Sequence, residues 1–292
     1  PVQPPVQPHV NAAAAERMFG SRHQSWSLSD TPISLIQNES ANCWFNSLLQ
    51  FLSRFPNAAN IDPAIRSQFS LNLANLINFV RQGLPINYQV HIRDSIFNQW
   101  RVYCDSEIRI ELKQSIFYTF TPPNNWKEER EIRRDLSGQQ DPVEFLPLWS
   151  QLLGWPVIQY GDLGIRRERQ TLQGFINRNG LLHRIHGDIA VIVRDRDQQD
   201  FNGDGHQFVN RSILQFSETV NIVEDGAEVQ FTPVSVIVHN GVDASGHYRC
   251  FVRDGSNWVI LDDDREPRIA EADDIRHLET GSRIIHFRRL HA

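Results

Sequence analysis

The spacing of apolar residues changes near residue 155, and this change limits the folds open to the chain. Up to about Gly154, apolar residues recur three and four positions apart, which is the period of an amphipathic helix. After Trp155 they form short β-branched or aromatic runs separated by Gly, Asp and Asn, a pattern typical of strands joined by turns. A helical front half and a strand-rich back half together predict an α+β fold with an antiparallel sheet.

Four helices are predicted in the front half. The first begins after Asn42, a residue type that favours the N-cap, and stops before the next proline. Residues 71–80 repeat the helical spacing, and residues 94–100 do so more weakly. The last helix spans residues 141–153, where Asp141 can act as N-cap and a proline takes the first helical position.

Strands are predicted wherever a short β-branched or aromatic run lies between turn residues. They cover residues 189–193, 219–223, 234–238, 248–252, 258–261 and 283–287. A DGSN turn makes a hairpin of the fourth and fifth strands. The run DFNGDG at 200–205 resembles the start of a calcium loop, but position twelve would be Arg211 rather than a bidentate glutamate. We therefore expect an ordinary turn there, flanked by strands.

Charge, apolar content and cysteine usage exclude several classes of protein. The net charge of −6 argues against a nucleic-acid partner, and the longest apolar run, residues 189–193, is far shorter than the roughly 18 residues that span a bilayer. The cysteines, Cys43, Cys104 and Cys250, are odd in number and include no CxxC pair, so neither a disulfide framework nor a zinc site is expected. This usage favours a reducing intracellular compartment, the cytoplasm or nucleus. We expect no metal or cofactor.

Cys43 is the cysteine whose position suggests chemistry. It falls in the first turn of the strongest predicted helix, where free N–H groups and the helix dipole stabilise a thiolate. An inert packing role is the general alternative for a cysteine, and Cys104 is expected to have such a role. Because no histidine lies near Cys43 in the sequence, a general base must come from a distant part of the chain.

His247 is the candidate base, because it opens the first strand of the predicted hairpin. If Arg253 pairs with Trp258, His247 lies across from Asp264 and diagonal to Asp262, so both carboxylates face it while that of Asp263 points away. A one-residue bulge would reverse this parity. An ordinary solvated acidic turn is the alternative interpretation. A thiol, an imidazole and a carboxylate are the three groups of a nucleophilic acyl-transfer site.

Several segments resemble the sequence boxes of the ubiquitin-specific proteases. NESANCWFNSLLQ at 38–50 is similar to the family's cysteine box, N-x-G-N-T-C-Y-M-N-S-x-L-Q. VIVHNGVDASGHYRCFVRDGSNWVILDDD resembles the histidine box, with its H-x-G, G-H-Y and W-x-x-F-D-D elements. QQDPVEFL at 139–146 is similar to Q-D-A-x-E-F-L, and SRIIHFRR resembles the closing A-Y-x-L-x-Y-x-R. The motifs keep the family's order over about 250 residues.

The resemblance implies a role for each matching residue. Cys43 would be the nucleophile, His247 the general base, Asp262 the acid that orients His247, and Asn38 a donor in the oxyanion hole.

Three further residues would contact the substrate. Asp141 matches an acidic position that engages the arginine-containing tail of ubiquitin, and Gly246 and Tyr248 belong to the G-H-Y element. His239, in the H-x-G element, would brace the loop before the catalytic histidine.

The resemblance also implies an architecture. It is a papain-like cysteine protease with a helical thumb, about 31–154, packed against a sheet-bearing palm with short, zinc-free fingers, about 155–292, after a linker at 1–30. The expected activity is hydrolysis after the C-terminal glycine of ubiquitin by a monomeric catalytic domain, with ubiquitin or ubiquitinated proteins as partners. The alternatives are a catalytically silent ubiquitin-binding module and a protease for another ubiquitin-like modifier.

The sequence departs from the family pattern at several positions. Ser40 replaces the glycine of the cysteine box, Asn42 replaces its threonine, and Trp44 and Phe45 follow the nucleophile. Cys250 takes the place of an aromatic residue in the histidine box. We therefore expect the oxyanion loop to be shaped differently here.

Overall fold

The computed structural model describes the greater part of the candidate site and its supporting elements. The described residues are 27–28, 31–39, 41–56, 68–106, 136, 138–143, 145–146, 169–179, 187–193, 199–201, 207–209, 212–224, 226–242 and 245–290. Nearly all of the predicted linker and residues 147–153 of the fourth predicted helix lie outside them.

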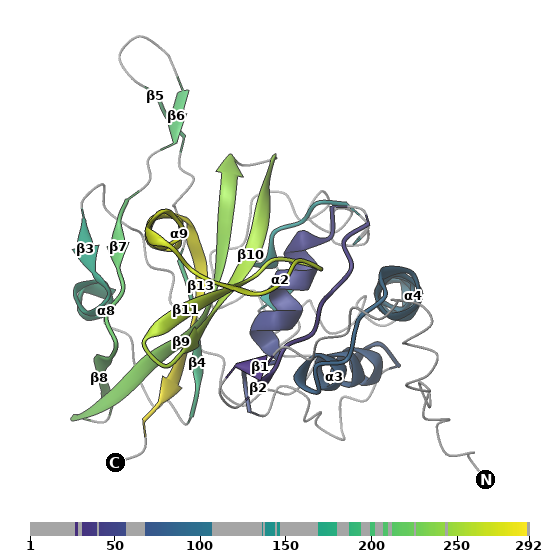
Figure 1. Ribbon diagram of the computed structural model, residues 1–292, viewed down its shortest axis with the longest axis horizontal. Coiled ribbons are helices and arrows are strands. Elements are labelled where there is room, and N and C mark those ends of the chain that lie inside the picture. The colour runs from purple at the N-terminus through teal and green to yellow at the C-terminus, as the bar shows by residue number, and fades with distance from the viewer. Residues whose placement is uncertain are drawn as a thin grey trace.

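The front half forms a helical layer, as its periodicity predicted. It contains α2 (Cys43–Leu52), α3 (Gln68–Arg81), a π-helical segment η2 (Tyr88–Phe97) and α4 (Asn98–Ser106). Every residue of α2 is buried, because it lies between the sheet on one side and α3 on the other (Figure 1). The described residues of the fourth predicted helix, 142–143 and 145–146, are helical.

The back half forms a seven-stranded antiparallel sheet in the order β12-β11-β10-β9-β13-β4, with β8 paired to β9. Its strands are β4 (Ile189–Ile192), β8 (Val220–Glu224), β9 (Ala227–Val242), β10 (Ser245–Asp254), β11 (Asn257–Leu261), β12 (Arg268–Ile269) and β13 (Ser282–Arg289). All six predicted strands are confirmed. The long strand β9 is central, since it pairs with three neighbours.

The sheet has a hydrophobic core on each face. Alternate residues of β10 point to opposite sides, so Cys250 and Val252 join the core that contains α2 and α3, while Phe251 joins the other. That second core includes side chains of α8 (Leu172–Asn179) and α9 (Ala272–Gly281). Helices thus cover both faces of the sheet, and Figure 1 shows α2 and α9 on opposite sides of β10.

Two helices of the back half, α8 and α9, were not predicted. The α9 segment ADDIRHLETG is short and mostly polar, so its apolar period is weak. Its start is fixed instead by a capping box, in which Glu271 and Asp274 each accept a hydrogen bond from the other's backbone N–H.

Short strands complete the described structure. β1 (Ser27–Leu28) pairs with β2 (Thr31–Pro32), and β3 (Gln170–Thr171) pairs in parallel with β7 (Leu214–Gln215). β5 (Gln199–Phe201) and β6 (Gln207–Val209) form a projecting hairpin (Figure 1), which confirms the strands expected beside the DFNGDG run. Residues 202–206, where the sequence predicted a turn, lie outside the described residues. Across the described part of the chain, no helix is both long and apolar enough to span a membrane.

Candidate active site

Cys43 is the first residue of α2, as predicted, and its side chain is buried. Asn42 holds the N-cap position, but its side chain makes no capping hydrogen bond to the helix. Its amide instead donates to the Gln37 carbonyl at 3.2 Å and to the Asn46 side chain at 3.0 Å, and its Oδ1 accepts from the Glu39 N–H at 3.2 Å. Asn42 therefore ties the loop before the helix to the first turn of the helix.

The β10–β11 hairpin has the predicted register. Arg253 pairs with Trp258, and the ladder continues to the pair of Cys250 and Leu261, where it ends. His247 lies three residues before Cys250 on β10, in a part of the strand that pairs with β9 through Asn240. The hairpin thus brings the beginning of β10 close to the residues that follow β11.

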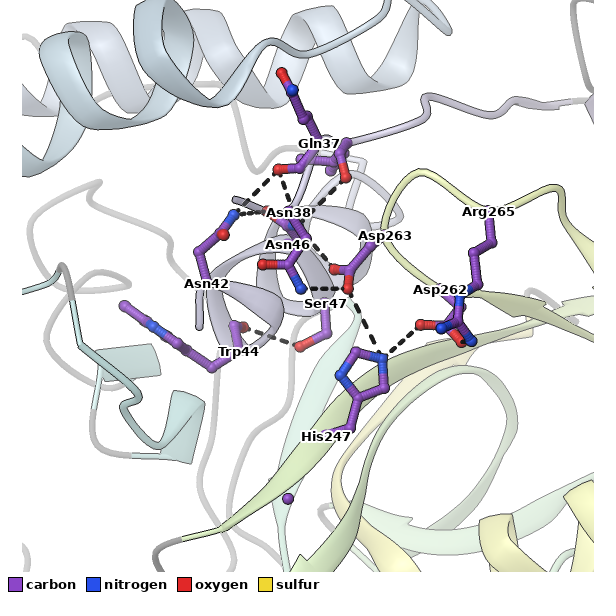
Figure 2. Close-up of polar contacts among 12 residues, drawn as sticks. Gln37, Asn38, Asn42, Trp44, Asn46, Ser47, His247, Asp262, Asp263 and Arg265 are labelled. Carbon is purple, nitrogen blue, oxygen red and sulfur yellow. Dashed lines mark hydrogen bonds and ion pairs between the residues drawn. The ribbon is translucent and has the colours of Figure 1, made fainter. Parts of the chain in front are cut away.

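His247 and Asp262 meet at this end of the hairpin (Figure 2). The Nε2 atom of His247 is 2.5 Å from Oδ1 of Asp262, and Oδ2 of Asp262 accepts a hydrogen bond from Arg265 at 3.1 Å. Burial opposes ionisation of Asp262, but the hydrogen bond to His247 and the nearby cations lower its pKa overall. Asp262 is therefore a carboxylate that holds the imidazole by its Nε2 atom.

The thiol of Cys43 lies close enough to the same imidazole to affect its ionisation. The hydrogen bond to Asp262 is the largest cause that raises the pKa of His247 to about 10, and a hydrogen bond to Cys43 is the next. Since Nε2 faces Asp262, the ring nitrogen left for the thiol is Nδ1. The structure therefore brings together three side chains from α2, β10 and the turn after β11.

The expectation that Asp263 points away from His247 is wrong. Its Oδ2 atom lies 3.8 Å from Nε2 of His247, on the same side as Asp262. Strand parity does not extend to Asp263, because the ladder ends at Leu261 and the backbone N–H of Arg265 closes a turn onto the Asp262 carbonyl at 3.0 Å. Within this turn Asp263 adopts a left-handed φ of 54°, which redirects its side chain. Asp264 is exposed.

Two asparagines hold the Asp263 carboxylate in place. Asn38 donates to Oδ2 at 2.7 Å and Asn46 donates to Oδ1 at 2.8 Å, as Figure 2 shows. Burial raises the pKa of Asp263, and these two hydrogen bonds oppose that rise. The side-chain amide of Asn38, expected to line the oxyanion hole, is thus oriented by Asp263.

Sequence reasoning did not identify Asp263 and Asn46 as parts of this cluster. Asn46 lies three residues after Cys43 on the same helix, a spacing that places both side chains on one face. The signal for Asp263 was present in the run of three aspartates, but strand parity assigned it to the wrong side.

His247, Asp262 and Asp263 are also the described residues whose ligand atoms could hold a metal ion, since these atoms lie within 4.8 Å of one another. Their contacts with Asn38, Asn46 and Arg265 account for the clustering without an ion.

The segment 138–141 is hydrogen-bonded to the residue next to Cys43 and to the residue next to His247. Trp44 donates from Nε1 to the Gly138 carbonyl at 3.1 Å, and Gln139 donates from Nε2 to the Gly246 carbonyl at 3.1 Å. Asp141, two residues farther on, caps its helix as predicted by accepting the backbone N–H of Val143 at 2.9 Å.

Gly246 and Tyr248 are positioned by the buried ring of His239. That ring stacks on Tyr248 with centroids 4.4 Å apart, and a Cβ added to Gly246 would overlap it. Pairing of Tyr248 with His239 across β10 and β9 explains why the ring lies there. The brace expected from His239 is therefore present beside His247.

Cys250, the other cysteine with a described side chain, lies in the hydrophobic core between the sheet and α2. It is fully buried among apolar residues, and burial raises its pKa to about 12. Cys250 therefore stays a neutral thiol at physiological pH.

No family model matches the sequence, and no curated protein matches it. The fold is similar to solved structures of a deubiquitinating (DUB) module. The SAGA Ubp8/Sgf11/Sus1/Sgf73 DUB module bound to ubiquitin aldehyde aligns with a TM-score of 0.54 at 12% identity, over 89% of this chain and 70% of that one. A SAGA DUB module bound to monoubiquitin gives 0.54 at 10% identity, over 96% and 75% of the two chains. At this level of identity the likeness shows a shared fold of helices and antiparallel sheet.

Proposed function

We propose that this chain is a deubiquitinating cysteine protease, which hydrolyses the isopeptide or peptide bond after the C-terminal glycine of ubiquitin. The observation that carries the proposal is the meeting of Cys43, His247 and Asp262, which come from three separate elements. The shared fold with ubiquitin-bound DUB modules supports ubiquitin as the substrate class. In this proposal the helical layer is the thumb and the sheet is the palm of a papain-like domain.

The proposed reaction begins with attack of the Cys43 sulfur, as thiolate, on the carbonyl carbon of the terminal glycine of ubiquitin. The imidazole of His247 carries the thiol proton and transfers it to the leaving amine as the C–N bond breaks. A thioester between Cys43 and ubiquitin remains. Water then attacks the thioester, giving its proton to His247, and the C–S bond breaks to release the carboxylic acid end of ubiquitin and to return the Cys43 thiolate beside the imidazolium. Asp262 stays ionised and stabilises the imidazolium throughout.

The oxyanion formed in each attack needs preorganised donors. The backbone N–H of Cys43 at the start of α2 is one candidate, and the Asn38 amide is the other. A carboxamide has two N–H groups. One of those on Asn38 is held by Asp263, which leaves the second for the oxyanion. Gly246, Tyr248 and Asp141 are proposed to contact the ubiquitin tail on its way to Cys43.

The test is a ubiquitin that carries an electrophile at its C-terminus. We expect a covalent adduct with the wild-type chain and with the control Cys250→Ala, and none with Cys43→Ala, as measured by intact mass. His247→Ala should lower turnover of a fluorogenic ubiquitin amide by about a thousandfold while the circular dichroism spectrum is preserved.

Other outcomes would replace the proposal. Tight binding of ubiquitin without an adduct would indicate a silent binding module. Adducts formed solely with another ubiquitin-like modifier would indicate a different substrate. Near-normal turnover by His247→Ala would remove His247 from the mechanism.

A further inference from the structure

Strand β13 contains a bulge at Arg283, next to the proposed site. Ser282 pairs with Val238 of β9, but Ile284 pairs with the adjacent Ile237, so Arg283 is the extra residue between them. On its other edge Arg283 still accepts a hydrogen bond from the Val193 N–H at 2.8 Å. A bulge changes the direction of the side chain that it carries. Here the bulge means that the side chain of Arg283 does not follow the regular alternation of side chains between the two faces of the sheet.

The side chain of Arg283 pairs with Asp141. Nη2 of Arg283 lies 3.0 Å from Oδ2 of Asp141, and the two side chains are 14% and 28% exposed. Charge-assisted hydrogen bonds of this kind are stronger when they are partly removed from water. Because Oδ1 of Asp141 accepts the N–H of Val143, Oδ2 is the carboxylate oxygen that faces a cation, and Arg283 already occupies it.

Asp141 belongs to the segment that borders the proposed active site. Hydrogen bonds from Trp44 to Gly138 and from Gln139 to Gly246 hold this segment beside Cys43 and His247. In the proposed function, the ubiquitin tail meets Asp141 on its way to Cys43, and this acid already has a cationic partner in the chain, Arg283.

The sequence around Arg283 departs from the pattern that it otherwise resembles. SRIIHFRR aligns with A-Y-x-L-x-Y-x-R, so Arg283 stands at the position of the first tyrosine. A tyrosine there could not neutralise Asp141. The family pattern therefore does not imply this ion pair.

We propose that Arg283 is an intramolecular competitor for the Asp141 carboxylate, which a basic residue of the substrate tail must displace. The inference rests on the proposed function, in which Asp141 binds the arginine-containing tail of ubiquitin. Arg283 weakens binding of a tail with an arginine at this point, and it has no such effect on a tail with a neutral residue there. Arg283 is therefore a specificity-determining residue.

The experiment compares two fluorogenic substrates, ubiquitin with its natural tail and ubiquitin whose tail arginines are replaced by glutamine. Arg283→Gln should lower KM for the natural tail about fivefold, which corresponds to about 1 kcal/mol, with kcat little changed. The same variant should leave KM for the glutamine tail unchanged. Arg276→Gln, on the exposed face of α9, makes the same change of charge and should behave as wild type.

Two further variants complete the test. In an Asp141→Asn background, where the N-cap is kept, Arg283→Gln should have no effect on KM. Arg283→Tyr, the residue type of the family pattern, should act like Arg283→Gln if the glutamine variant folds poorly.

The inference is overturned if Arg283→Gln and Arg283→Tyr leave KM for the natural tail unchanged, or lower KM equally for both tails. It is also overturned if the effect persists in Asp141→Asn. Formation of the Cys43 adduct separates this failure from that of the proposed function, because the adduct forms whether or not Arg283 competes.

Discussion

At the scale of single residues, the candidate site contains two adjacent carboxylates, Asp262 and Asp263, which have different hydrogen-bond partners. Asp262 contacts His247 directly, whereas Asp263 accepts hydrogen bonds from Asn38 and Asn46 and lies farther from the imidazole. The two acids therefore suit two tasks. In the proposed mechanism, Asp262 orients the base and stabilises its charged form, and Asp263 positions the oxyanion donor.

Replacing each acid by asparagine should separate these tasks. Asp262→Asn should lower turnover about a thousandfold or more and lower the pKa of His247, because its hydrogen bond is the main cause of the raised value. Asp263→Asn should lower kcat by about tenfold to a hundredfold with little change in the pKa of His247, because one of its two asparagine donors loses its acceptor. Turnover and an NMR titration of the His247 ring measure both effects. An equal shift of the His247 pKa in the two variants would contradict this division.

At the scale of secondary-structure elements, the start of α9 depends on Asp274. This buried carboxylate accepts two hydrogen bonds from the guanidinium group of Arg268, at 2.5 and 2.8 Å, and one from the backbone N–H of Glu271, at 3.0 Å. The hydrogen bonds from Arg268 are the main cause that lowers the pKa of Asp274 to about 2. The element is therefore fixed by electrostatics at its first turn, while Leu278 anchors it in the core.

Asp274→Ala should destabilise the protein by about 1–2 kcal/mol, measured by urea unfolding at pH 7. Because the folded pKa lies below the ordinary value of 3.8, the stability due to its charge is complete above about pH 4 and is lost as the pH falls toward 2. Asp274→Asn is the matched control, since its amide oxygen still accepts the Glu271 N–H. The asparagine variant should lose less stability than the alanine variant. Equal losses would show that the capping box does not contribute to stability.

At the scale of the whole molecule, two histidines give stability opposite dependences on pH. His286 is fully buried between Asp188, at 2.9 Å, and Ser235, at 3.2 Å, and it stacks on Phe55. Burial lowers its pKa to about 4, although the hydrogen bond to Asp188 opposes this shift. The pKa of His247 is raised, so its contribution to stability changes with pH in the opposite direction.

The free energy of unfolding should therefore be highest near neutral pH. Since the folded pKa of His286 is below its ordinary value of 6.5, its contribution is complete above pH 6.5 and falls by at most about 3 kcal/mol as the pH drops to 4. The contribution of His247 is complete below pH 6.5 and declines as the pH rises toward 10. Urea unfolding between pH 4 and 10 measures both slopes.

His286→Gln isolates the acid side of this curve. Glutamine does not titrate, and its amide can still contact Asp188 and Ser235. The variant should be less stable at pH 7, because the stacking on Phe55 is lost, and its stability should change less between pH 6.5 and 4. A slope equal to that of the wild type would assign the acid dependence to other groups.

The sequence by itself predicted the features that depend on short-range chemistry. Apolar period placed α2 and α3, β-branched runs placed six strands, and a four-residue turn set the register of the β10–β11 hairpin. Each helix, strand and hairpin register depends on residues within about one helical turn or one hairpin. Side chains that are neighbours in the sequence are therefore sufficient to determine it. Helix α9 was missed because a polar helix held by its cap has little apolar period.

Tertiary structure alone decided the contacts of Asp263 and of Arg283, which the sequence did not predict. Asn38 and Asp263 are 225 residues apart, and Asp141 and Arg283 are 142 apart. Their contacts depend on where a ladder ends and where a bulge falls, because either event turns one side chain to the opposite face. The period of apolar residues does not locate such events, because it continues unchanged through the position where a ladder ends or a bulge falls. The sequence thus determined the residue types of the site and the pairing of His247 with Asp262, whereas the tertiary structure decided the partners of Asp263 and Arg283.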